Sequence, residues 1–179
     1  MIFCYTKKQL QAALHFDILK TFICFGKRGI GMALRKIVMA EDDILRKKSR
    51  KVETVDDKIR KLLNDMAETM YHGNGGGLAA VQVGILKRLI VVDMGTGLYQ
   101  LINPIIIASE GTQFVTEGCL SVPGRYGKLI RPKKVTIQAL NPDGETITIT
   151  AENDLAKCFC HEIDHLDGTL FTDKVIEYL

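Results

Sequence analysis

The chain has 179 residues, 46% of them hydrophobic and 25% charged, a composition typical of one globular domain long enough to bury a core. Its formal net charge of +3 is too small to predict a nucleic-acid or membrane-surface partner. No apolar run approaches the roughly 18 residues that a transmembrane helix needs, so a membrane-spanning helix is excluded.

Residues 1–31 differ in character from the rest of the chain. They form a weakly amphipathic stretch that contains Asp17 and lacks the small-residue cleavage site of a secretory signal. A second methionine, Met32, begins MALRKIVMAEDD, which is typical of the start of a domain. We therefore expect an N-terminal extension of unknown role, residues 1–31, followed by a single domain, residues 32–179. The alternative is that residues 1–31 are sequence upstream of the real start.

The segment TVDDKIRKLLNDMAETMYHG predicts a helix near the start of this domain. Thr54 is a natural N-cap, with Asp57 three residues later as in a capping box. Gly73 is typical of a helix C-terminus, and His72 before it is interpreted as a C-terminal cap rather than a ligand. Between these ends, apolar residues recur at helical spacing: Ile59, Leu62, Leu63, Met66 and Met70.

A glycine-rich run follows, GNGGGLAAVQVG at residues 73–84. Its ordinary interpretation is a flexible linker, and it has neither the Gly-Lys-Ser/Thr of a Walker loop nor the strand that precedes a dinucleotide loop. Such a turn also lets another backbone approach closely, here that of a peptide-like substrate. Gln82, just beyond the glycines, carries an amide that can donate to an oxyanion.

The middle of the chain predicts strands. LKRLIVVDM is typical of a buried strand, and LYQLINPIIIA predicts a second one that Pro104 bends or confines to an edge. KKVTIQALNPDGETITITAE predicts a hairpin, in which threonines facing water alternate with packed isoleucines after the turn at residues 141–144. The order of helix, antiparallel strands and helix predicts an α+β fold.

The last helix, expected from about Asn153 to Gly168, carries the sequence HEIDH. His161 and His165 are four residues apart and share one helix face, so both imidazoles can reach one ion. Glu162 lies beside that face, as does the general base in the H-E-x-x-H helix of zinc peptidases. The alternative is a buried helix with two hydrogen-bonded histidines.

A third ligand decides between these two interpretations. Downstream of His165 the only glutamate is Glu177, which makes a peptidase-like third ligand a poor choice. Upstream, EGCLS places Cys119 in a stretch that we expect to be a loop, and a thiolate binds Zn(II) or Fe(II) well. Taken alone, an isolated cysteine such as Cys119 is more often a small hydrophobic residue near a turn than a ligand. Cys158 and Cys160 compete for the role, but Cys158 is expected to pack and Cys160 to point to another face.

The five cysteines as a set also indicate a compartment. They are odd in number and lack the regular spacing of a disulfide framework: Cys4, Cys24, Cys119, Cys158 and Cys160. Disulfide-built secreted domains carry regular, even sets, so we expect reduced thiols in a cytoplasmic protein.

Three motifs together resemble the peptide deformylase family. GGGLAAVQ, EGCLS and HEIDH occur in the order and approximate spacing of that family's G-x-G-L-A-A-x-Q, E-G-C-L-S and H-E-x-D-H. The resemblance extends from about Met32 to the C-terminus. It implies a single catalytic α+β domain, residues 32–179, with antiparallel sheets packed around the C-terminal metal-binding helix and with an N-terminal helix. It also implies hydrolytic removal of the N-formyl group from N-formylmethionine of new polypeptides, with release of formate.

The resemblance further implies a metal centre. Cys119, His161 and His165 are its expected ligands, Fe(II) is the expected ion, and Zn(II) or Ni(II) is expected to substitute for it. Glu162 is expected to act as general base and then as general acid.

The resemblance implies substrate contacts and partners as well. Gln82 and the backbone N–H of Leu120 are expected to stabilise the oxyanion, and Gly77 and Gly118 to border the peptide cleft. The expected partners are N-formylmethionyl peptides of nascent chains near the ribosome, with no direct nucleic-acid or membrane contact. We expect a monomer in the bacterial cytoplasm.

The chain departs from the family pattern at Gly76, at Cys160 and in residues 1–31, which have no counterpart in the short bacterial forms, and two rival functions remain. Gly76 stands where the family has a bulky aliphatic residue, which predicts a looser pocket rim, and Cys160 replaces a polar residue. Asp164 is a candidate for orienting a neighbour of the ligands, with Arg131 as its possible partner. The rivals are a zinc peptidase that uses Glu177 and a non-catalytic metal-binding module closed by Cys158 or Cys160.

Overall fold

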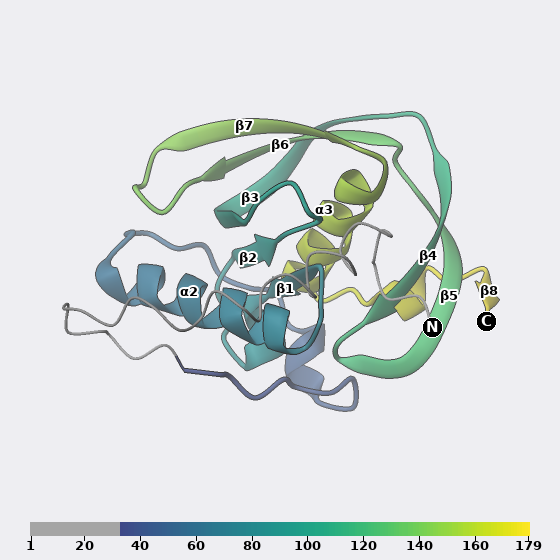
Figure 1. The fold of residues 1–179 in the computed structure, drawn as a ribbon, viewed down its shortest axis with the longest axis horizontal. Helices are drawn as coiled ribbons and strands as arrows, with labels where there is room; N and C mark the ends of the chain where they lie inside the picture. Colours follow the sequence, from purple (N-terminus) through teal and green to yellow (C-terminus); the bar gives the residue numbers. More distant parts are fainter. Residues whose placement is uncertain (1–32) are drawn as a thin grey trace, which may run out of the picture.

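The structure, a computed structural model, describes residues 33–179, so the predicted extension of residues 1–31 lies outside the described part of the chain. Figure 1 shows the two long helices and the strands of this part. The elements, in chain order, are η1 (Asp43–Arg46), α2 (Asp57–His72), β1 (Gly77–Ala79), η2 (Ala80–Val83), β2 (Leu89–Val92), β3 (Tyr99–Glu110), β4 (Gln113–Cys119), β5 (Val122–Arg131), β6 (Lys134–Leu140), β7 (Thr146–Glu152), α3 (Asn153–Leu166), η3 (Phe171–Asp173) and β8 (Glu177–Tyr178).

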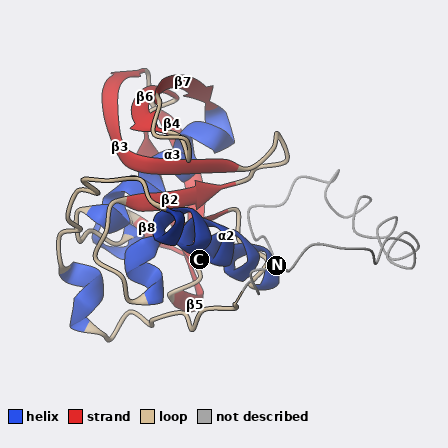
Figure 2. Ribbon diagram, turned by 90° about the vertical axis from the view of Figure 1, so that its left-hand side faces the viewer, coloured by secondary structure: helices blue, strands red, loops and turns tan. Residues whose placement is uncertain are grey.

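The strands form two antiparallel sheets, which confirms the α+β prediction. One has the order β1-β2-β3-β6-β7 and the other the order β4-β5-β8. Helix α3 packs on one face of the five-stranded sheet and α2 on the opposite face, and in Figure 2 strand β2 lies between the two helices. None of the helices within residues 33–179 is long and apolar enough to cross a membrane.

All four residues of strand β2, LIVV, are buried. Ile90 and Val92 pack in the cluster that contains α3, whereas Leu89 and Val91 pack in the cluster that contains α2. Because alternate side chains of a strand point to opposite faces, a strand covered on both sides is apolar at every position. The buried strand predicted for this segment is confirmed.

Helix α2 begins slightly later than predicted. Its N-cap is Asp56, whose Oδ1 accepts a hydrogen bond from the N–H of Ile59 at 2.9 Å, so the assignment of Thr54 as N-cap is wrong. Both side chains are good caps, and the apolar positions leave the register of the first turn open by two residues. Gly73 is the C-cap, as predicted.

Strand β3 is bent and is not an edge strand. It lies between β2 and β6, and its pairing with β6 shifts register between Ile102 and Ile105, around Pro104. A proline has no N–H to donate, so it is accommodated at such an irregularity. The predicted hairpin is confirmed as β6 and β7, which pair in unbroken register from Lys134↔Glu152 to Leu140↔Thr146.

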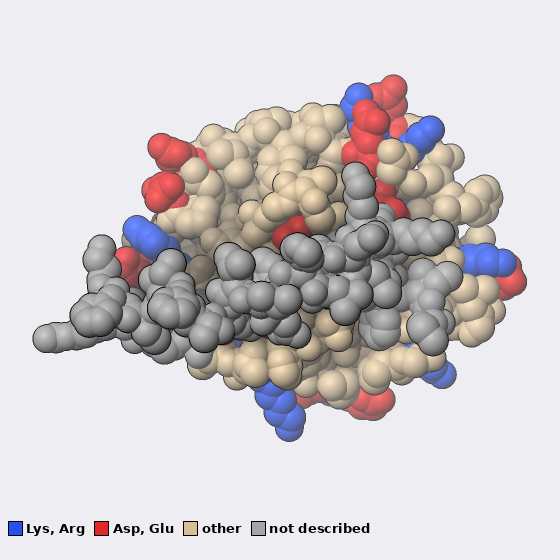
Figure 3. Space-filling view, viewed as in Figure 1, with Lys and Arg blue, Asp and Glu red and all other residues tan. Residues whose placement is uncertain are grey.

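The segment EGCLS is not the loop that the sequence predicted. Glu117 to Cys119 end strand β4, Cys119 pairs with Val122 of β5, and only Leu120 and Ser121 form the turn between them. Cys119 is therefore held by a sheet rather than by a mobile segment. On the face shown in Figure 3, acidic and basic side chains are interspersed around the outline, in keeping with the small net charge.

Candidate metal centre

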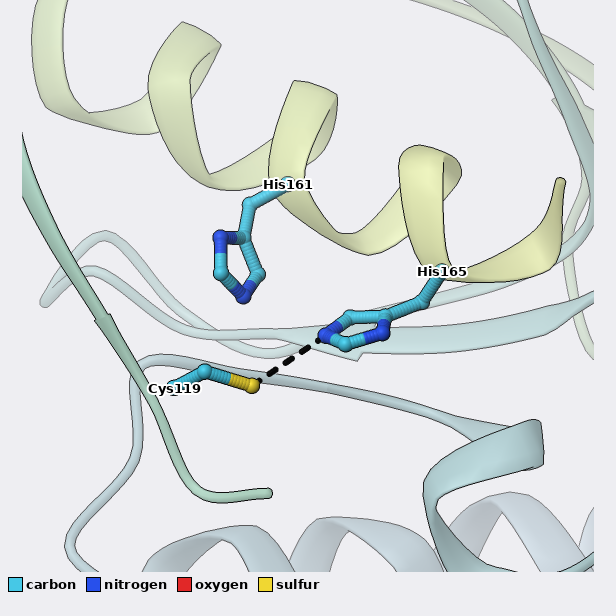
Figure 4. Close-up of side chains that lie close together, drawn as sticks. All are labelled: Cys119, His161 and His165. Atoms are coloured by element: carbon cyan, nitrogen blue, oxygen red, sulfur yellow. Dashed lines mark hydrogen bonds between the residues drawn. The ribbon is translucent and has the colours of Figure 1, made fainter. Parts of the chain in front are cut away.

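Cys119, His161 and His165 converge at one point. The ligand atoms of these three residues lie within 4.8 Å of one another, and the Cys119 Sγ is 3.3 Å from the His165 Nε2 (Figure 4). The two imidazoles come from successive turns of α3, and the thiol comes from the last residue of β4. Within residues 33–179 this is the one group of three or more His, Cys, Asp or Glu side chains placed to hold a metal ion.

The donor set fits a divalent transition metal. Two imidazoles and one thiolate suit Zn(II), Fe(II) and Ni(II), and three protein ligands leave a position for water or substrate. Burial lowers the pKa of His165 well below 6.5, so this ring is neutral and has a lone pair for an ion. Burial also acts on His161, but its hydrogen bonds with Cys119 and Glu117 outweigh burial and raise its pKa well above 6.5. Loading the centre therefore displaces a proton.

A buried carboxylate fixes the ring of His161. The Glu117 Oε2 lies 2.7 Å from the His161 Nδ1, which leaves the Nε2 of that ring for an ion. Burial alone raises the pKa of Glu117, but its hydrogen bonds with His161 and Arg131 lower it to about 2. The carboxyl is therefore charged at any ordinary pH.

Arg131 connects this carboxylate to α3. Its Nε and Nη2 donate to the two oxygens of Glu117 at 2.7 and 2.9 Å, and its Nη1 donates to Asp164 at 2.5 Å. The partnership of Arg131 and Asp164 anticipated from the sequence is confirmed. The role of Glu117 was not anticipated. Its signal was an acidic residue two positions before the candidate ligand Cys119. The pairing of β4 with β5 is irregular between these two residues, so strand alternation alone does not place them on one face.

Glu162 is a buried carboxyl beside the centre. It is 3% exposed, its Oε2 has no hydrogen-bond partner among the described residues, and burial raises its pKa to about 7. A Cβ on Gly77 would lie 2.8 Å from both the Cγ and the Cδ of Glu162. The glycine-rich run thus allows a close approach, as predicted, but at Gly77 the approaching group is a side chain of this chain. At Gly75 it is the side chain of Leu120, 2.7 Å from where a Cβ would be.

Gln82 lies on the 3-10 turn η2 rather than in a loop. Its Oε1 accepts from the N–H of Ala79 at 2.8 Å, and its Nε2 donates to the Ser121 Oγ at 3.2 Å and the Cys119 Sγ at 3.4 Å. The amide NH₂ is therefore turned toward the thiol of the cluster. The next residue after that thiol, Leu120, stands at the turn between β4 and β5.

A cavity of about 330 Å³ opens beside the cluster. The glycine segment 73–77, the β4–β5 hairpin and α3 line it, with Gln82, Cys119, His161 and Glu162 in its wall. Gly77 and Gly118, expected to border a peptide cleft, both line it. Gly118 leaves room for Tyr126, whose Cε1 would lie 2.7 Å from a Cβ there.

The residues required by the rival interpretations lie elsewhere. Glu177 is on β8 and pairs with Lys128 at 3.0 Å. The Cys158 Sγ faces the carbonyl of Gly76 at 3.5 Å, and Cys160 is buried near Arg131, with burial raising its pKa to about 11. Within residues 33–179, neither a downstream carboxylate nor a second thiolate joins the cluster as a fourth ligand.

Known proteins are similar to this chain in sequence and in fold. A family model described as polypeptide deformylase matches residues 34–178. Peptide deformylase 2 of Clostridium acetobutylicum is 62% identical over 149 residues, which cover 83% of this chain and 99% of that relative. The solved peptide deformylase of Thermotoga maritima is 38% identical at a TM-score of 0.79 over 80% of this chain and 98% of that one. The peptide deformylase of Legionella pneumophila is 45% identical at a TM-score of 0.78, over 80% and 86%.

Proposed function

Because this chain belongs to the polypeptide deformylase family, we propose that Cys119, His161 and His165 hold its catalytic metal ion and that Glu162 transfers its protons. The chain is a hydrolase that removes the N-formyl group from N-formylmethionine of newly made polypeptides and releases formate. The observation that carries the assignment is the convergence of three ligand atoms within 4.8 Å, next to a buried carboxyl.

The ion is proposed to be Fe(II), with Zn(II) or Ni(II) able to substitute. When bound, it acts as a Lewis acid that makes hydroxide available near neutral pH. The thiolate of Cys119 supports the choice, because a soft sulfur donor suits these ions and not Mg(II) or Ca(II).

Glu162 is proposed as the general base and then the general acid. A carboxyl whose pKa is about 7 without an ion can both accept and release a proton near neutrality. It takes a proton from the attacking water and returns it to the nitrogen of methionine as the C–N bond of the formamide breaks. The products are formate and a free amino terminus, so atoms and charges balance.

Two donors are proposed to stabilise the negative charge that develops on the formyl oxygen. The Nε2 of Gln82 is aimed by the bond from the Ala79 N–H to its Oε1, and the backbone N–H of Leu120 follows the ligand Cys119 at the hairpin turn. Donors fixed in advance need no reorganisation during the reaction. Removing one such donor typically costs on the order of 10²–10³ in rate.

Glu117 and Arg131 are proposed as positioning residues. They do not reach the reacting atoms, but Glu117 sets which nitrogen of His161 carries the proton, and Arg131 holds Glu117. Partners of this kind keep a ligand ring in its coordinating orientation.

The substrate is proposed to lie in the 330 Å³ cavity between Gly77 and Gly118, with its formyl group toward the cluster. We further propose that residues 32–179 form one catalytic domain that works as a monomer in the bacterial cytoplasm, on nascent chains close to the ribosome. Residues 1–31 are proposed to be an extension of this domain.

The proposal is tested by formate release from formyl-Met-Ala-Ser under anaerobic conditions. The chelator-treated protein is reloaded in parallel with Fe(II), Zn(II) or Ni(II). We expect formate at one equivalent per peptide, no cleavage of internal peptide bonds, and the highest rate with Fe(II). Cleavage of internal bonds would support a peptidase, and a folded, metal-loaded protein without turnover would support a binding module.

A further inference from the structure

Arg125 is a charged side chain of the cavity wall that has no charged partner. It lies on β5 and is exposed, and within residues 33–179 it forms no ion pair. The other lysine or arginine of the wall, Lys157, pairs with Asp154 at 2.8 Å. Of the two carboxyls of the wall, Glu117 binds Arg131 and His161, whereas Glu162 is 3% exposed and lies close against Gly77. Among the charged side chains of the described wall, Arg125 is therefore the exposed one that forms no ion pair.

The C-terminal strand holds that guanidinium in place. The Arg125 Cζ lies 6.0 Å from the centroid of the Tyr178 ring, within the range of a cation–π contact. Tyr178 is fixed by the pairing of β8 with β5, in which it stands opposite Gly127, and the Leu179 N–H donates to the Tyr126 carbonyl at 3.0 Å. An arginine stacked in this way loses less side-chain freedom on binding an anion than an unsupported one.

The distance along the hairpin indicates which part of a peptide reaches Arg125. Val122 pairs with the ligand Cys119, and Arg125 stands three residues further along β5, roughly 10 Å at the rise of a strand. The proposal places the peptide along β5: with its formyl group at the cluster and its extended backbone directed toward Arg125, it advances by about 3.3 Å per residue. Its second to fourth residues therefore pass within reach of the Arg125 side chain.

We propose that Arg125 is a specificity-determining residue that binds an acidic side chain at the second, third or fourth residue of the formylated peptide. The proposal rests on the deformylase function proposed above. A guanidinium presents paired N–H donors that match both oxygens of a carboxylate, which a lysine does not. The contact is solvent-exposed, so it favours an acidic peptide by about two- to fivefold in kcat/KM, and high salt weakens it.

The test compares peptides of equal size and different charge. Formyl-Met-Ala-Ala-Ala is prepared with Asp or with the isosteric Asn at residue two, three or four, and kcat/KM is measured by formate release. Arg125→Gln removes the charge. Lys133→Gln is the matched control, because Lys133 is an exposed residue outside the cavity wall and its loss changes the net charge equally. Tyr178→Leu removes the ring beneath the guanidinium and keeps the charge.

The proposal predicts an Asp/Asn ratio of at least two at one position in the wild type and in Lys133→Gln. The ratio should fall to about one in Arg125→Gln and to an intermediate value in Tyr178→Leu. A ratio of one in the wild type, or an unchanged ratio in Arg125→Gln, overturns it. Turnover of the neutral peptide separates the deformylase function from the role of Arg125. If the wild type hydrolyses the neutral peptide but shows an Asp/Asn ratio of one, the deformylase function stands and only the role of Arg125 is excluded.

Discussion

Replacing Gly77 with alanine tests whether the position of the Glu162 carboxyl controls the reaction. The new Cβ would lie 2.8 Å from the Cγ and Cδ of Glu162, closer than carbon atoms approach without displacement. Gly77 pairs with Val92 in β1, so its backbone is held and the side chain of Glu162 has to move. Glu162 is 3% exposed and lines the cavity, so we expect its displaced carboxyl to shift away from Gly77 into that space.

The structure sets the size of the effect. Restoring an ordinary contact of about 3.5–4.0 Å requires a shift of roughly 1 Å at the carboxyl, and a misplacement of that size can cost about 10²-fold in rate. The three atoms nearest to the new Cβ all belong to Glu162 and none to a ligand, so the variant should bind one equivalent of metal and show kcat reduced by about 10²-fold. The assay is formate release at saturating formyl-Met-Ala-Ser, with metal content measured on the same sample.

A double-variant cycle shows whether the alanine acts through Glu162. If it does, Gly77→Ala should cost little in a protein that already carries Glu162→Gln, because the displaced group is no longer the base. If the two substitutions reduce kcat independently, or if Gly77→Ala keeps more than about a third of the wild-type rate, the position of the Glu162 carboxyl does not control the reaction.

Three further predictions concern the buried charges and the ligands. Arg131→Met leaves the Glu117 carboxylate buried without its main partner and should lower the free energy of unfolding by about 3–5 kcal/mol in urea titrations, and an unchanged unfolding midpoint would contradict this. In the metal-free protein, the raised pKa of Glu162 means that stability from its protonated form is complete below pH 4.5 and is lost as the pH rises through about 7. Glu162→Gln should therefore flatten the pH dependence of unfolding over that window by about 3 kcal/mol, whereas a parallel pair of curves would show that the carboxyl is not perturbed. Cys119→Ala should fold but retain less than a tenth of an equivalent of metal after gel filtration, and a full equivalent would exclude Cys119 as a ligand.

The ligands are the part of the centre that follows most directly from the sequence. His161 and His165 share a helix face by their spacing alone, and this holds wherever the helix is placed. Cys119 could be assigned as a ligand only from the motif around it, because the distance from its thiol to the two histidines depends on how β4 lies against α3. The sequence predicted a loop at this segment, because EGCLS contains small residues typical of turns. In the structure β4 continues to Cys119, and the chain turns within the next two residues.

The contact between Glu117 and Arg131, which supports the ligand His161, could not be predicted from the sequence. Glu117 and Arg131 are 14 residues apart, and their meeting depends on the register of the β4–β5 hairpin, including its irregularity between Glu117 and Cys119. A shift of one residue would turn either side chain to the other face. The N-cap of α2 could not be chosen from the sequence either, because Thr54 and Asp56 are both good caps. Only the structure shows that the Asp56 carboxylate accepts a hydrogen bond from the N–H of Ile59.

The most direct test of the central claim is formate release by Glu162→Gln at full metal occupancy. The amide has nearly the shape of the carboxyl and cannot accept a proton, so we expect normal metal content and a fall in kcat of at least about 10³-fold. Activity within tenfold of the wild type in a sample with one equivalent of metal would contradict the assignment of Glu162 as the base.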